Sequence, residues 1–144
     1  MATTFSIITD VDLNVDELFT RSLDIDVHLQ SMQHSKERAI GGVTSGQIGL
    51  GESVTWRAKH FGVWFTMTSR ITALEYPYRF VDEQTSGPFR AFRHEHAFEP
   101  TLHGTRMVDT ITIASPVFGV VVERLILVPY LRRLIETRNR SLIE

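Results

Sequence analysis

A long stretch of alternating polar and apolar residues, followed by one long helical pattern, most constrains the fold of this chain. Between Arg38 and Ile113 the hydrophobic period is two, which is typical of β-strands with one buried face. After Pro116 the pattern becomes helical and continues to the last residues. A curved sheet and a single amphipathic helix have to bury their apolar faces against each other. The sequence therefore predicts an α+β helix-grip architecture, a curved antiparallel sheet around a long C-terminal helix.

Breaks in the alternation and turn residues give the predicted limits of the strands. A short first strand is expected at Phe5 to Thr9, and further strands at 53–60, 63–74, 79–86, 89–99 and 105–113. Because short connections usually join neighbouring antiparallel strands, about six or seven strands are expected to form a meander. Within the segment 63–74, the alternation places Phe65, Met67, Ile71 and Ala73 on one face.

Short helices are predicted after the first strand. Asn14 is suited to cap a helix and Glu17 to complete a capping box, and a second helical turn is expected at about 26–32. In the last helix an apolar stripe is formed by Val117, Val121, Val128, Leu131 and Ile135, with Phe118, Val122 and Leu125 beside it. Pro129 is expected to kink this helix or to begin a new one. A cationic surface near the helix end is expected from Arg132, Arg133, Arg138 and Arg140.

Length and composition predict a single domain over residues 1–144. The net charge of -2 is spread without a basic cluster, which argues against nucleic acid and anionic membranes as partners. The chain has no cysteine, which excludes disulfides, thiolate metal sites and a cysteine nucleophile. The most apolar window, 117–128, carries two charged residues and is too short for membrane insertion. Without a recognisable secretion signal, a cytoplasmic location is expected.

His94 and His96 are the most informative polar residues. Their spacing of two in a predicted strand places both imidazoles on one face, together with Phe92 and Phe98. On the next strand Asp109 shares a face with Met107 and Ile111, so Asp109 is positioned to pair with one of the histidines. A carboxylate beside an imidazole fixes its tautomer and raises its basicity. His60 lies on the same side as Trp56 by alternation and is a candidate third member.

Four interpretations of these residues stay open. The histidines are either satisfied by hydrogen bonds in a partly polar core, or orient a ligand, or act in acid–base catalysis. The fourth is a metal site, in which His60 or Asp109 would add a third ligand. Nothing else in the sequence indicates a metal or another cofactor, so none is predicted. Catalytic candidates are His94, His96 and Asp109.

Three segments carry a resemblance to a known superfamily. They are Gly51 to Gly62, then Gly87-Pro88-Phe89 leading into the strand with Phe92 to Phe98, then Gly104 to Asp109 running to Pro116. With the order of the elements, they make nearly the whole chain resemble the START/Bet v 1-like superfamily of polyketide cyclases, aromatases and lipid-binding proteins. The resemblance implies a cavity between sheet and helix that receives an apolar or amphipathic molecule.

The leading hypothesis is therefore a module that carries, sequesters or senses a small hydrophobic ligand. Its predicted ligand-binding residues are Trp56, His60, Phe65, Phe80, Phe92, His94, His96, Phe98, Met107 and Asp109. The second hypothesis is a cyclase or dehydratase with a histidine as base and Asp109 as its orienter. A third is an interaction module, because the helix is apolar on more than one face between Val117 and Leu131, as at a homodimer or partner contact.

Overall fold

The computed structural model describes residues 2–115 and 123–142. Along the chain the elements are β1 (Thr3–Val11), α1 (Val15–Ser22), α2 (Ile25–Ser31), η1 (Gln33–Ser35), β2 (Arg38–Gly42), β3 (Ser53–His60), β4 (Val63–Glu75), β5 (Arg79–Ser86), β6 (Ala91–Pro100), β7 (Thr105–Ala114), η2 (Glu123–Leu127) and α4 (Val128–Leu142). Among these described residues no helix is long and apolar enough to cross a membrane.

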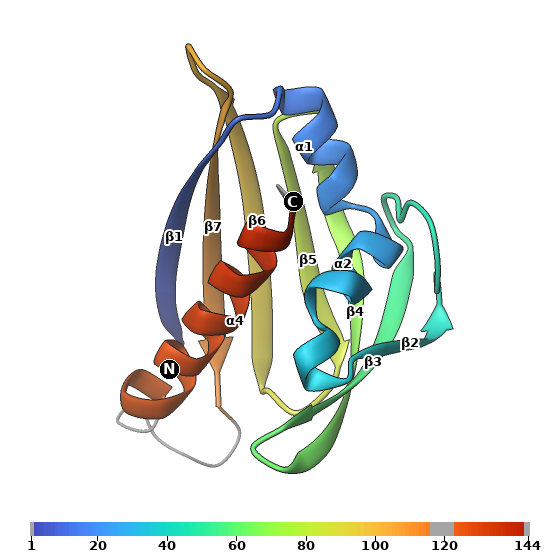
Figure 1. The fold of residues 1–144 in the computed structure, drawn as a ribbon. Coiled ribbons are helices and arrows are strands. Elements are labelled where there is room, and N and C mark those ends of the chain that lie inside the picture. Colours follow the sequence, from blue (N-terminus) through green and yellow to red (C-terminus); the bar gives the residue numbers. More distant parts are fainter. Residues whose placement is uncertain (1, 116–122, 143–144) are drawn as a thin grey trace.

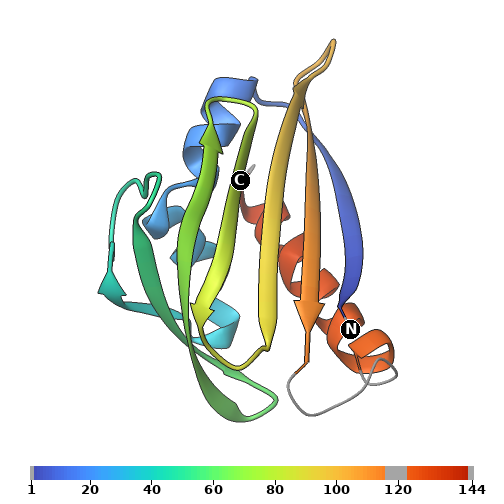
Figure 2. The same ribbon diagram turned by 180° about the vertical axis from the view of Figure 1, so that it is seen from behind.

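The strands form one antiparallel sheet whose order is β1-β7-β6-β5-β4-β3-β2. Strands β2 to β7 form a meander. The first strand of the chain, β1, pairs with the last, β7, and forms the edge of the sheet opposite β2. The three α-helices of the described residues lie on one face of the sheet (Figure 1), and the view from behind shows that they leave the other face uncovered (Figure 2). The predicted helix-grip α+β fold and its strand number are confirmed.

One face assignment within β4 is wrong. The register between β4 and β5 shifts between Ile71 and Ala73, so Ala73 pairs with Val81 and Leu74 pairs with Phe80. Phe80 is in the buried core, and Leu74 packs against the same cluster. A β-bulge places two residues opposite one and turns the following side chains to the other face. Leu74, rather than the predicted Ala73, therefore continues the inner face after Ile71.

The helix ends follow local chemistry. The side chain of Asn14 accepts a hydrogen bond from the backbone N–H of Glu17 at 2.9 Å, which confirms the predicted cap of α1. At the C-terminal end, a π-helical turn is followed by α4, in which Pro129 is the second residue. Proline suits the first turn of a helix because the N–H groups there have no partner within the helix. The predicted stripe residues Val117, Phe118, Val121 and Val122 lie outside the described residues.

Two apolar clusters hold the helices on the inner face of the sheet. The first joins α1 to the middle strands and is centred on the buried residues Leu18, Phe19 and Met107. The second joins Ile135 of α4 to buried isoleucines and a phenylalanine of β1 and β7. Both clusters include residues of β1 and β7, and the first also reaches β3 to β6.

Candidate functional site

A cavity of about 670 Å³ lies between the inner face of the sheet and the helices. Its apolar wall includes Trp56, Phe65, Met67, Ile71, Phe80, Phe92, Leu131 and Ile135. On β3 and β4, Trp56 pairs with Met67 and Ala58 with Phe65, so these inward positions form a continuous surface. The volume is in the range of cavities that enclose a small organic molecule.

Most of the predicted ligand-binding residues line this cavity. They are Trp56, His60, Phe65, Phe80, Phe92, His94 and His96. Phe98 and Met107 instead lie in the core, where Phe98 makes an edge-on ring contact with Phe19 of α1. The alternation in the sequence predicts correctly that both side chains lie on the inner face. It does not predict that α1 packs over this end of the sheet and fills the space there. Whether the residues of the lining contact a ligand stays a prediction.

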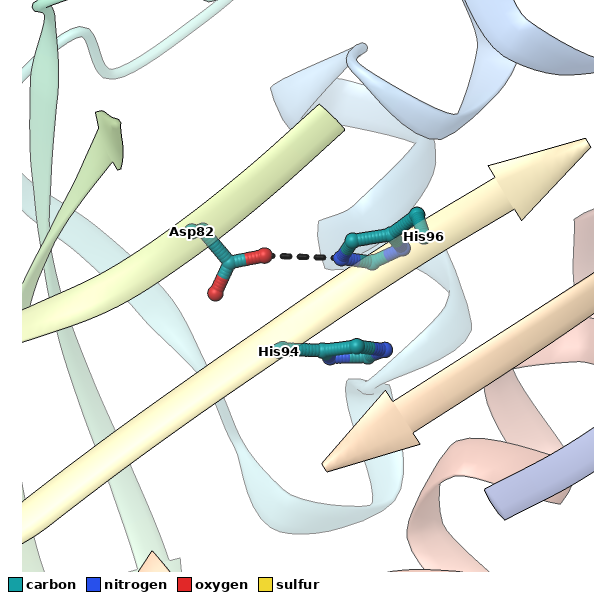
Figure 3. A group of neighbouring side chains, drawn as sticks. All are labelled: Asp82, His94 and His96. Carbon is teal, nitrogen blue, oxygen red and sulfur yellow. Dashed lines mark hydrogen bonds and ion pairs between the residues drawn. The ribbon is translucent and has the colours of Figure 1, made fainter. Parts of the chain in front are cut away.

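His94 and His96 stand side by side on β6 with parallel rings (Figure 3). Their ring centroids are 3.7 Å apart with planes at 17°, and Phe80 stacks on His96 at 4.0 Å. His96 is thus enclosed between two rings and is 1% exposed. His94 is the outer member of the stack and has a further surface toward the cavity.

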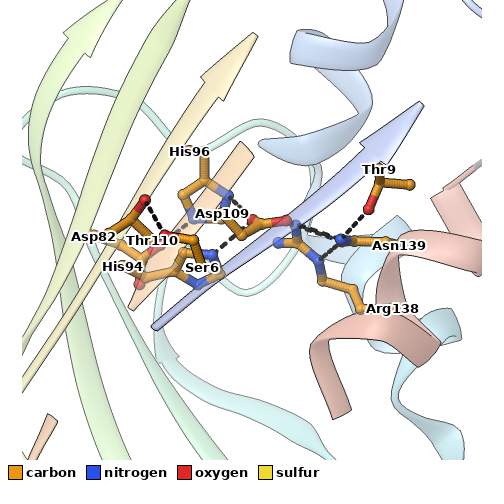
Figure 4. A network of polar contacts seen from close by, with 9 residues as sticks. All are labelled: Ser6, Thr9, Asp82, His94, His96, Asp109, Thr110, Arg138 and Asn139. Carbon is orange, nitrogen blue, oxygen red and sulfur yellow. Dashed lines mark hydrogen bonds and ion pairs between the residues drawn. The ribbon is translucent and has the colours of Figure 1, made fainter. Parts of the chain in front are cut away.

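Asp109 of β7 lies behind the two histidines and does not line the cavity. His94 Nε2 is 2.7 Å from Asp109 Oδ1, and His96 Nδ1 is 3.4 Å from the same oxygen. The carboxylate also accepts hydrogen bonds from Arg138 at 3.2 Å and from Asn139 at 2.8 Å (Figure 4). Burial raises the pKa of Asp109, but Arg138 and the hydrogen bond from His94 outweigh burial and hold that pKa well below its usual range.

Arg138 corrects one sequence prediction. It was assigned to a cationic surface, but it is 6% exposed and belongs to the buried network with Asp109 and Asn139. The physical reason is helical spacing, since Leu131, Ile135 and Arg138 follow one another at four and then three residues and share the inner side of α4. A buried guanidinium needs a counter-charge, which Asp109 supplies.

Asp82 is the site residue that the sequence reasoning missed. It lies on β5 between Ile71 of β4 and His94 of β6 in the sheet register, and it lines the cavity. His96 Nε2 is 2.7 Å from Asp82 Oδ2. The available signal was its spacing of two from Phe80, which places both side chains on the same face of the strand.

His60 is not part of this group. Its Nδ1 is 2.7 Å from the hydroxyl of Tyr130 in α4, which links the tip of the β3–β4 hairpin to the helix. Phe61 packs on the same tyrosine at 4.3 Å between ring centroids. Burial lowers the pKa of His60, so its pairing with Tyr130 is mainly a contact between neutral groups.

Asp82, His94 and His96 each offer one ligand atom for a metal, and these atoms lie within 4.8 Å of one another. The set resembles two histidines and a carboxylate around a transition metal. However, an imidazole binds a metal in its own ring plane, and the two rings here are stacked in nearly parallel planes. One ring would have to leave the stack before both nitrogens could reach one ion, so the arrangement seen favours hydrogen bonding over metal binding.

Burial and the neighbouring His94 lower the pKa of His96 from 6.5 to about 4. The folded protein therefore binds fewer protons than the unfolded chain between these values, and stability is lost as the pH falls through this window. We expect the wild type to lose about 2 kcal/mol of unfolding free energy between about pH 7 and about pH 5 through this residue. His96→Gln should remove that share of the loss, whereas His103→Gln, on an exposed loop, should retain it. Urea unfolding at the two pH values measures the difference, and an equal loss in both variants would contradict this assignment.

The chain is a helix-grip protein by its architecture, and solved structures share the same fold. An aromatase/cyclase from a Streptomyces species superimposes with a TM-score of 0.78 at 14% identity, over 99% of this chain and 92% of the other. A Thermus thermophilus protein gives 0.73 at 15% identity, over 99% and 94% of the chains. Ara h 8.0201 gives 0.68 at 12% identity and full coverage of both chains, 100%.

These comparisons confirm the structural likeness to Bet v 1-like and aromatase/cyclase proteins that the sequence indicated. No protein-family model matches the sequence, and no curated protein matches it. At these low identities the likeness concerns the fold, so the chemistry has to be argued from the residues of this chain.

Proposed function

We propose that this protein binds a small hydrophobic or amphipathic molecule in the cavity between the sheet and α4, as a carrier, store or sensor. The observation that carries the proposal is the cavity of about 670 Å³, whose wall is mostly aliphatic and aromatic with a few polar groups from β5, β6 and α4. Ligand sites of this kind use the apolar wall for affinity and the polar groups for orientation.

Native mass spectrometry of gently purified protein tests the proposal. We expect a fraction of molecules to carry a non-covalent adduct that dissociates under activation and appears in an organic extract. The same preparation, stripped by extraction and refolded, should take up decanol as a neutral probe. Absence of an adduct together with failure to bind decanol would contradict the proposal.

A second candidate function is a dehydratase or cyclase that uses His94 as its base. The specific observation is that His94 lines the cavity while its Nε2 is 2.7 Å from the buried Asp109. This leaves the other ring nitrogen to remove a proton next to a carbonyl. The protonated imidazole then gives that proton to the departing β-hydroxyl, which leaves as water as the double bond forms. With a phenyl-bearing β-hydroxyketone as substrate, the wild type should form the enone faster than His94→Gln. Equal rates in the two proteins would exclude this role.

Self-association through the start of the C-terminal helix is the third candidate. Leu125 and Ile126 of η2 are 72% and 52% exposed, which is unusual for large apolar side chains next to one another. We expect a second copy of this chain to cover them. Sedimentation velocity over a hundredfold range of concentration should then show a dimer that Leu125→Asp weakens, and a monomer throughout the range would contradict it.

A further inference from the structure

The charges on the wall of the cavity are unbalanced. Three carboxylates line it, those of Asp24, Glu37 and Asp82, whereas Arg138 is the only arginine or lysine among the described lining residues. The charge of Arg138 is already matched by Asp109, whose Oδ1 lies 3.2 Å from the guanidinium. The described wall therefore keeps negative charge that no permanent cation of its own offsets.

Two of these carboxylates have their own partners. Asp24 caps α2 by accepting from the backbone N–H groups of Asp26 at 2.8 Å and Val27 at 3.1 Å. Glu37 Oε1 is 2.7 Å from His28 Nε2. Their charges are thus stabilised by a helix N-terminus and by a histidine, and neither needs a ligand.

Asp82 differs from both. Its Oδ2 accepts from His96, but its Oδ1 makes no hydrogen bond within the described part of the chain. Its side chain is 22% exposed and faces the cavity between Ile71 and His94. Figure 3 shows the second oxygen of Asp82 directed away from both imidazoles. An ionised carboxylate accepts up to about four hydrogen bonds, so Asp82 has unused acceptor capacity on a mostly apolar wall.

His96 does not neutralise Asp82 at neutral pH. Burial raises the pKa of Asp82, but the hydrogen bond from His96 and the nearby positive groups outweigh it, and the net effect is a lowered pKa. His96 itself has a pKa of about 4. At pH 7 the pair is therefore a carboxylate that accepts from a neutral imidazole.

We propose that the cavity selects a hydrophobic molecule that carries one protonated amine, and that the ammonium group donates a hydrogen bond to Asp82 Oδ1. The inference rests on the proposed binding function and adds the chemical class of the ligand. The apolar body of the amine occupies the space along Phe65, Met67 and Ile71. A primary alkylamine is protonated at pH 7, as lysine is with its pKa of about 10.4.

The same charges disfavour other ligands. A fatty acid would bring a second carboxylate to a wall that is already negative, and Arg138 is engaged with Asp109. Like charges repel strongly in an apolar cavity because the local dielectric constant is low. A neutral alcohol can also donate a hydrogen bond to the Asp82 carboxylate, but it brings no positive charge and therefore lacks the ion-pair attraction that an ammonium group adds.

Isothermal titration calorimetry with decylamine, decanol and decanoate at neutral pH tests this selection, because the three probes share one apolar chain. We expect decylamine to bind roughly 10- to 100-fold more tightly than decanol, because its ammonium group adds an ion pair with Asp82 to the hydrogen bond, and decanoate to bind most weakly. Asp82→Asn should reduce the advantage of decylamine over decanol to about threefold or less. Asp16→Asn, on the exposed surface of α1, is the matched control and should leave the order and ratios unchanged.

The outcomes separate the two proposals. If decanol or decanoate binds the wild type as tightly as decylamine does, the amine inference is wrong and the binding function stands. If none of the three probes binds, both fail. Circular dichroism shows whether Asp82→Asn folds. If it does not, the order of the three affinities in the wild type still decides whether the cavity prefers amines. An amine preference that survives in a folded Asp82→Asn variant would also overturn the inference.

Discussion

Asp109→Ala is expected to lower the free energy of unfolding by about 3 to 5 kcal/mol, the usual effect of removing one partner of a buried ion pair. The side chain is 0% exposed and is the counter-charge of Arg138, which is itself 6% exposed. Without it, the guanidinium stays buried and uncompensated, and Asn139 and His94 each lose an acceptor. Urea unfolding at neutral pH, followed by circular dichroism, measures the change.

Asp10→Ala is the matched control for this experiment. Asp10 lies on the edge strand β1 and likewise pairs with an arginine, Arg106, at 2.9 Å, but both side chains are largely exposed. Solvent screens such pairs, so the unfolding midpoint of this variant should stay near that of the wild type. A similar midpoint for Asp109→Ala would mean that the polar network behind the histidines does not stabilise the fold.

Ala58→Trp is expected to weaken the binding of decanol at least tenfold while leaving the protein folded. Ala58 points from β3 into the cavity, and its cross-strand partner is Phe65, at the neighbouring position of β4 on the same wall. Overpacking a filled core costs about 1 to 3 kcal/mol, but here the indole can extend into existing space. We therefore expect at least a tenfold rise in Kd with less than about 1 kcal/mol of destabilisation. Calorimetry and urea unfolding supply the two values.

Ala97→Trp is the corresponding control, because Ala97 alternates with His96 and Phe98 and lies on the outer face of the sheet. Its affinity for decanol should equal that of the wild type. If both tryptophan variants bind decanol normally, the ligand occupies another part of the molecule. If Ala58→Trp unfolds, the space beside Ala58 is smaller than the structure indicates.

The sequence predicted the sheet and the histidine pair because both depend on local alternation. His94, His96 and Asp109 have fixed positions on neighbouring strands, and the register that pairs His96 with Asp109 brings the three together. The bulge after Ile71 could not be predicted, since no glycine or proline marks it and its cause is pairing with another strand. A short stretch of sequence does not indicate which residues of another strand it will pair with.

The missed residues of the site have a different explanation. Arg138 follows an apolar stripe at helical spacing, but an arginine near a helix end is usually solvated, and only the buried Asp109 makes its burial favourable. The pattern at 79–86 predicts a strand but does not show which of its faces is buried, so Asp82 does not stand out. In both cases the decisive information is the identity of a partner far away in the sequence.

Methyl NMR with isotope-labelled isoleucine tests the central claim most directly, because isoleucines lie both on the cavity wall and on the outside. Titrating decanol should shift the methyl signals of Ile48, Ile71 and Ile135, which line the cavity. The signals of Ile8 and Ile40, which are 64% and 54% exposed and do not line it, should remain in place. Shifts confined to Ile8 and Ile40, or no shift at saturating decanol, would contradict a ligand-binding function for the cavity.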